Sequence, residues 1–99
     1  MFDPPTTIVG LMHVALRLPL CRSLKEKRSA IKPCIQHLRR QMNLAVSETG
    51  DQDLRRSSIL ALVTVSGDKD LVEQTLAHAE RYLYSRPDLE VVDAQIEIL

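Results

Sequence analysis

The sequence predicts one α+β domain with a ferredoxin-like arrangement, in which a four-stranded antiparallel sheet carries two helices on one face. Four segments with alternating or continuous apolar residues predict strands, and two segments with apolar residues three and four apart predict helices. Their order along the chain is β-α-β-β-α-β. The 99 residues suffice for a single hydrophobic core, so we assign residues 1–99 to one domain.

The first strand is predicted at residues 8–18, after an extended tail at residues 1–7. Pro4 and Pro5 exclude a helix in this tail. The strand segment is rich in β-branched residues and alternates in hydrophobicity, as a half-buried strand does. It ends before Pro19, which cannot donate a hydrogen bond to a neighbouring strand.

The first helix is predicted to begin after Ser23. Ser23 and Glu26 have the spacing of a capping box, in which Glu26 would accept a hydrogen bond from the Ser23 N–H. An apolar stripe then continues to Met42. Pro33 lies within this stripe and removes one helical hydrogen bond, so we expect one kinked helix rather than two helices.

The remaining elements follow from the same patterns. A nearly continuous apolar segment predicts a central strand buried on both sides, and acidic residues after Gly67 favour a helix N-terminus. The predicted elements are a strand at 44–48, a polar loop at 49–56, a strand at 58–66, a helix at 68–85 and a strand at 89–99.

Charge is distributed unevenly along a chain whose formal net charge is zero. From Arg17 to Arg40 there are eight Lys and Arg residues and one acid, whereas residues 66–99 hold eight acids and three bases. The neutral total argues against a uniformly basic nucleic-acid binder. The distribution instead predicts a molecule with a basic and an acidic region.

A candidate anion or RNA site surrounds the start of the first helix. Cations there oppose the helix dipole and cost stability, which calls for an explanation. Helix N–H groups together with Lys and Arg can hold phosphate. The alternative interpretation is a solvated helix face, with Glu26 offsetting part of the repulsion. The candidate residues are Arg22, Lys25, Lys27, Arg28, Lys32, Arg55 and Arg56. Arg39 and Arg40 could extend this surface if the polar loop folds towards the helix.

The face of the sheet opposite the helices is predicted to be apolar. Such a surface is typical of contact with a partner, and we expect a homo-oligomer formed through this face or through an edge strand. The three aromatic residues lie in the tail and on the second helix, so this face lacks the rings that stack RNA bases. The residues assigned to the face are Val9, Leu11, His13, Ala15, Leu60, Leu62 and Val91.

The sequence contains no recognisable catalytic motif. The loop after the first strand has no glycine to cradle phosphate, and no nucleotide-binding motif is present. Glu48, Asp51 and Asp53 offer carboxylates for Mg²⁺, although adjacent arginines neutralise them. The two cysteines have no metal-site spacing and are interpreted as reduced thiols of a cytoplasmic protein. We expect no catalytic residue, no metal, no cofactor and no membrane partner.

A resemblance to a known family covers nearly the whole chain after Thr7. Its most specific part is Ser-Leu-Lys-Glu-Lys-Arg at residues 23–28, supported by residues 91–93 and 96–99. In these stretches the chain resembles the uncharacterised domain family 503, the YlxP-like proteins of bacteria. The resemblance implies a ferredoxin-like fold and no established activity. Genes of this family tend to lie beside those for translation initiation and ribosome maturation, so the resemblance implies work near RNA or ribosomes.

Two hypotheses for function follow. The first is a small non-enzymatic protein that binds RNA or a ribosomal particle through the basic surface of the first helix. The alternative is a homo-oligomeric scaffold that uses the apolar open face of the sheet.

Overall fold

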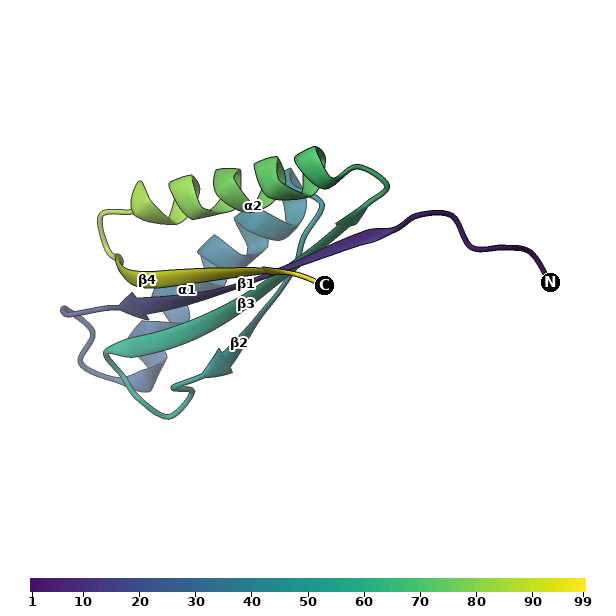
Figure 1. Ribbon diagram of the computed structural model, residues 1–99. Helices are drawn as coiled ribbons and strands as arrows, with labels where there is room; N and C mark the ends of the chain where they lie inside the picture. The colour runs from purple at the N-terminus through teal and green to yellow at the C-terminus, as the bar shows by residue number, and fades with distance from the viewer.

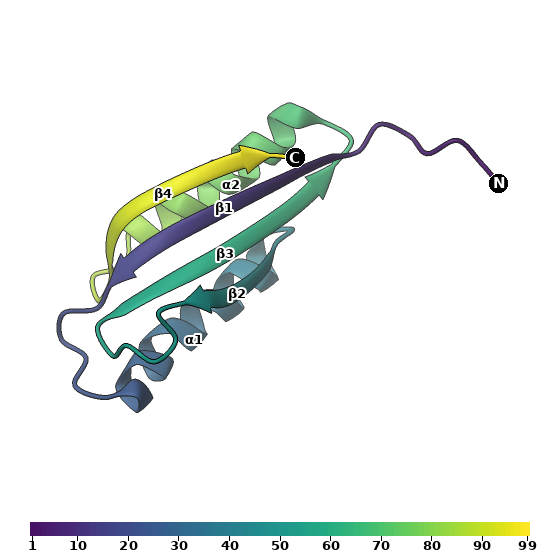
Figure 2. The ribbon, with the colours of Figure 1, turned by 60° about the horizontal axis from the view of Figure 1, so that its bottom comes forward.

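The computed structural model describes all 99 residues as one sheet covered by two helices (Figure 1). The strands are antiparallel, in the order β2-β3-β1-β4, and both helices lie on one side of them, so Figure 2 shows the other side uncovered. This confirms the predicted ferredoxin-like architecture. The elements are β1 (Ile8–Arg17), α1 (Leu24–Gln41), β2 (Ala45–Gly50), β3 (Ser57–Ser66), α2 (Lys69–Tyr84) and β4 (Glu90–Ile98).

The core lies between the sheet and the helices. Alternate residues of β1 are fully or almost fully buried, and they face apolar residues of α1 and α2. The N-terminal tail extends away from the domain (Figure 1). Neither helix is both long enough and apolar enough to cross a membrane.

Leu60 and Leu62 lie on the helix side of the sheet, so their predicted position on the open face is wrong. In an antiparallel pair, residues directly opposite one another point to the same face. Leu60 is opposite Val14 and Leu62 is opposite Met12, and all four are completely buried. Because strand side chains alternate with a period of two, a shift of one residue in the assignment moved both leucines to the wrong face.

Val91 also faces the helices, because β4 contains an irregularity that the alternating pattern does not reveal. Its pairing with β1 shifts between Ala15 and Leu16, so that Val92 has no direct partner. Val91 is therefore opposite the buried Leu16 and packs against the core.

On the face of the sheet without helices, the open face, β1 and β3 contribute seven apolar residues. Val9, Leu11 and His13 keep their predicted places, with both apolar residues partly buried and His13 exposed. Beside them, β3 presents the odd-numbered residues of its sequence rather than the two leucines. The apolar open-face residues are Val9, Leu11, Ala15, Ile59, Ala61, Val63 and Val65.

Helix α1 continues through Pro33 as one element of 18 residues. Ser23 is its N-cap, and the Ser23 Oγ accepts a hydrogen bond from the Glu26 N–H at 3.1 Å. The other half of the predicted capping box is different, since the Glu26 carboxylate accepts from the N–H of Arg22 instead of Ser23. Two side-chain contacts thus fix the start of the helix. The second involves the N–H of Arg22, one residue before the expected donor Ser23.

Candidate anion-binding site at the first helix

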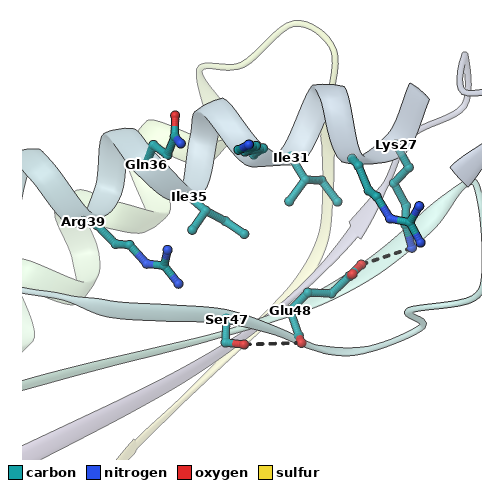
Figure 3. Close-up of a pocket in the computed structure, with 9 residues that line it drawn as sticks. Lys27, Ile31, Ile35, Gln36, Arg39, Ser47 and Glu48 are labelled. Atoms are coloured by element: carbon teal, nitrogen blue, oxygen red, sulfur yellow. Dashed lines mark hydrogen bonds and ion pairs between the residues drawn. The ribbon is translucent and has the colours of Figure 1, made fainter. Parts of the chain in front are cut away.

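Lys27 is 1% exposed, although it belongs to the predicted basic surface. Its Nζ donates to the carbonyl oxygens of Asp51, Gln52 and Ser57 at 2.8, 3.2 and 3.1 Å. It also lies 3.0 Å from Oε2 of Glu48 on β2 (Figure 3). With four acceptors for three ammonium protons, this side chain has no free donor for a ligand.

Lys27 therefore connects α1 to the segment between β2 and β3. The carboxylate of Glu48 is held from a second side, because Ser58 Oγ donates to its Oε2 at 2.6 Å. Ser58 itself is completely buried. Lys27 is therefore not available to a ligand, so its predicted place in the anion site is wrong. The carboxylate of Glu48, a candidate Mg²⁺ ligand in the sequence, is likewise engaged by Lys27 and Ser58.

The other cations of α1 remain on the surface. Lys25, Arg28 and Lys32 are exposed, and none has a carboxylate within ion-pair distance. Their spacing of three and four residues places them along one side of the helix. Three positive charges of this helix are therefore free to meet an anion.

A hollow of about 390 Å³ lies between α1 and the edge strand β2. Ile31 and Ile35 extend from α1 into this space, and Arg39 extends from the same helix farther along (Figure 3). Arg28 and Lys32 also line the hollow. It therefore combines two apolar side chains with four cationic ones, of which Lys27 is paired with the Glu48 carboxylate that also lines the hollow.

Arg39 lines this hollow, although the sequence indicated it only as a possible extension of the basic surface. Its Nη2 donates to the Val46 carbonyl oxygen at 2.6 Å, which orients the guanidinium across the gap between helix and strand. Arg39 lies seven residues after Lys32, a spacing of two helical turns that could have placed it on the same side.

The remaining predicted cations lie outside the hollow. Arg22 and Arg55 are exposed and do not line it. Arg56 donates from Nε to the Cys21 carbonyl oxygen at 3.3 Å and so contacts the loop between β1 and α1. The loop after β2 thus brings Arg56 close to the start of α1. A basic surface that continues from the helix onto this loop requires such a position.

Both cysteines are buried free thiols, with Cys34 inside α1 and Cys21 in the loop before it. Burial raises the pKa of the Cys34 thiol, and the nearby Arg86 guanidinium opposes that rise. Burial also raises the pKa of Cys21, and the Glu26 carboxylate adds to the rise. Both thiols are therefore protonated at neutral pH, when a thiol is a weak nucleophile.

A second, smaller hollow of about 270 Å³ lies on the open face. His13 and Asp93 contribute its polar side chains together with Gln95, while Ala15 and Ile59 are apolar. No group of three or more His, Cys, Asp or Glu side chains has the arrangement of a metal site.

These features define a small α+β protein with one basic helix face and one uncovered sheet face. Residues 9–96 match a family described as "Protein of unknown function (DUF503)", and the chain belongs to this family. The chain is also 29% identical over 68 residues to "Uncharacterized protein YlxP" of Bacillus subtilis (strain 168), covering 69% of this chain and 74% of that protein.

Solved structures with low sequence identity share the fold. Protein SO0527 from Shewanella oneidensis has a TM-score of 0.51 at 19% identity, covering 97% of this chain and 91% of its own. The de novo designed protein Foldit4 has a TM-score of 0.52 at 13% identity, covering 92% and 96%. At these identities the likeness establishes the fold alone.

Proposed function

We propose that this protein is a small non-enzymatic RNA-binding module that contacts RNA, free or in a ribosomal particle, through the exposed side of α1. The observation that carries the proposal is that Lys25, Arg28 and Lys32 lie together without carboxylate partners. Phosphate groups are the partners that such a row of cations attracts most strongly in nucleic acids.

The hollow beside these cations supports the same ligand. The cationic side chains of Arg28, Lys32 and Arg39 surround a space with an apolar side formed by Ile31 and Ile35. A nucleotide has a corresponding division, with a charged phosphate and a flat base that can rest on apolar surface. The location on the helix side also agrees with the absence of aromatic rings from the open face of the sheet.

The cost of this arrangement is further support. Lys25 lies in the first turn of α1, where the positive end of the helix dipole disfavours a cation. Lys27 in the same turn is held by Glu48, but Lys25 and Arg28 have no such compensation. A bound phosphate would supply the missing negative charge at this end of the helix.

Charge reversal on α1 tests the proposal. Binding of the wild-type chain and of Arg28→Glu/Lys32→Glu to a structured RNA should be measured over a range of salt concentrations. The matched control is Lys69→Glu/Arg81→Glu, which makes the same charge change on exposed residues of α2. We expect the α1 variant to lose most of its affinity and about two units of the logarithmic salt slope, because each phosphate contact contributes about one.

Equal binding by the two double variants would contradict the proposal, because it would mean that only the total charge matters. Co-sedimentation with ribosomal particles at low salt, lost on raising the salt, would indicate that the RNA bound by this site is ribosomal. Retention of the α1 variant on those particles would exclude this surface as the contact.

The alternative function is a homo-oligomeric scaffold that uses the open face of the sheet. The exposed Val63 and Val65, next to the half-buried Leu11, favour it. Leu11→Lys should then convert the oligomer to monomers in sedimentation velocity. A wild-type chain that is monomeric at high concentration would contradict this alternative without affecting the RNA proposal.

A further inference from the structure

The two edges of the sheet differ in how their backbone groups are covered. At the edge formed by β2, the carbonyl oxygens of Val46 and Glu48 accept hydrogen bonds from Arg39 at 2.6 Å and Gln52 at 2.9 Å. These two residues are two positions apart, so their backbone groups point the same way, outward from the sheet. The chain's own side chains thus protect this edge against pairing with another strand.

The edge formed by β4 has little such protection. The Leu99 N–H donates to the Val9 carbonyl oxygen at 2.9 Å, which shows that odd-numbered residues at this end bond to β1. The backbone groups of Ala94, Ile96 and Ile98 consequently point outward. Of these, the Ala94 N–H has a side-chain partner, Oδ1 of Asp93 at 2.9 Å, and the other two residues have none.

The side chains of β4 leave this edge open as well. Ile96 is 48% exposed and Val92 is 56% exposed. Lys and Pro, which commonly block strand addition at a sheet edge, are absent from Glu90–Ile98. A strand with unpaired backbone groups and exposed apolar side chains is suited to pair with another strand.

We propose that β4 pairs antiparallel with β4 of a second copy of this chain, about a two-fold axis at Ile96. The sheet would then continue through eight strands. In this register Ile96 lies opposite Ile96 of the second copy, and Gln95 lies opposite Glu97. Ala94 lies opposite Ile98, with the Ala94 N–H exchanging its Asp93 partner for a backbone carbonyl.

Charge selects this register among its neighbours. An axis at Gln95 would place Asp93 opposite Glu97, and an axis at Glu97 would place two glutamates opposite each other; both pairings are unfavourable. An axis at Ala94 would centre the pair on the N–H that Asp93 already occupies, next to the irregularity at Val92. The axis at Ile96 sets an amide against each Glu97 carboxylate.

The register also separates polar from apolar side chains. Ala94 and Ile96 lie on the helix side, because they are opposite the buried Val14 and Met12 of β1. The apolar layer under the helices would therefore continue from one copy to the other, while Gln95 and Glu97 stay on the open face. Each α1 remains far from the axis, so this inference does not depend on RNA binding.

Sedimentation velocity over a range of concentrations tests the proposal with Ile96→Lys. The control is Val65→Lys, which makes the same change at a 46%-exposed apolar residue of the open face. We expect a dimer for the wild type and the control, and a monomer for Ile96→Lys. A monomeric wild type at several hundred micromolar, or a monomeric control beside a dimeric Ile96→Lys, would overturn the proposal.

Cysteine pairing tests the register by a route that needs no loss of assembly. Gln95→Cys and Glu97→Cys change exposed residues, and the native cysteines are buried. Under mild oxidation, the mixture of the two variants should form a disulfide-linked dimer, whereas each variant alone should form little. Linkage in the separate variants equal to that in the mixture would exclude this register and overturn the proposal.

Discussion

Lys25 and Lys27 lie two residues apart in the first turn of α1 and have opposite surroundings. Lys25 is exposed and has no carboxylate partner, whereas Lys27 is enclosed by three carbonyl oxygens and Glu48. A difference of two positions turns a side chain by about 200° around a helix, from solvent to the interior. Identical residues in one basic segment can therefore have unrelated roles.

The energetic consequences of the two lysines also differ. A buried ammonium has lost its water and depends on protein acceptors, so its stability contribution rests on every partner staying in place. An exposed lysine near a helix N-terminus is solvated and slightly destabilising. The buried side of α1 should therefore govern folding and the exposed side should govern binding, and the variants below test this separation.

The largest effect is expected for Lys27→Met, which keeps the length of the side chain and removes its charge. Three carbonyl oxygens lose their donor and Glu48 loses its counter-ion, so the free energy of unfolding should fall by about 3–5 kcal/mol. Urea unfolding followed by circular dichroism measures this change. The control Lys25→Met should change the same quantity by less than about 0.5 kcal/mol.

A second substitution tests whether the loss comes from the unpaired carboxylate of Glu48. If the loss in Lys27→Met comes from the stranded carboxylate, then adding Glu48→Gln should restore part of it. Equal stability of Lys27→Met and Lys25→Met would show that Lys27 is not enclosed in solution. Lys27 would then be an exposed cation of α1, available to a ligand as Lys25 is.

The next largest effect is expected for Ser58→Ala. Ser58 Oγ donates to the carboxylate that pairs with Lys27, and hydrogen bonds to charged groups contribute about 1.5–3 kcal/mol. The free energy of unfolding should fall by an amount in this range, measured by the same urea titration. In the Glu48→Gln background the loss should become smaller, and an unchanged loss would show that the hydroxyl acts through packing alone.

Most of the fold could be predicted from the sequence, because strand and helix periodicities are local properties. Burial of Lys27 could not be predicted in this way, since its acceptors lie 21–30 residues later and a lysine in a basic segment looks exposed. The same limit applies to Leu60 and Leu62. In a continuously apolar strand, both faces look alike until pairing with β1 fixes them.

The capping contact of Ser23 should have an effect of about 1 kcal/mol. Ser23→Ala removes the acceptor of the Glu26 N–H and should lower the free energy of unfolding by that amount. Ser23→Asp is the matched control, because it retains an acceptor and adds a negative charge that suits a helix start. A loss as large in Ser23→Asp as in Ser23→Ala would show that the serine has a role other than capping.

Alkaline pH should lower the free energy of unfolding through the buried thiol of Cys34 in α1. Burial raises the pKa of this thiol above its ordinary value of 9.0, so the folded chain holds the proton more tightly than the unfolded chain does. The contribution of Cys34 to the free energy of unfolding is therefore constant below pH 9, and it falls as the pH rises from there towards the raised pKa. Thermal unfolding between pH 8 and pH 10.5 should show a steeper loss for the wild type than for Cys34→Ala. Parallel curves would assign the alkaline loss to other groups, such as Tyr82, whose pKa burial also raises.

The smallest effect on stability is expected for Lys25→Gln, and its sign is the informative part. Removing a cation from the first turn of α1 should raise the free energy of unfolding by about 0.3 kcal/mol at low salt. The same change should lower RNA affinity and reduce the salt slope of binding by about one unit, if this side chain contacts a phosphate. Stability and binding would then move in opposite directions at one residue, as expected for a charge kept for a ligand. A variant that is more stable and binds RNA as well as the wild type would show that Lys25 belongs to a solvated helix face.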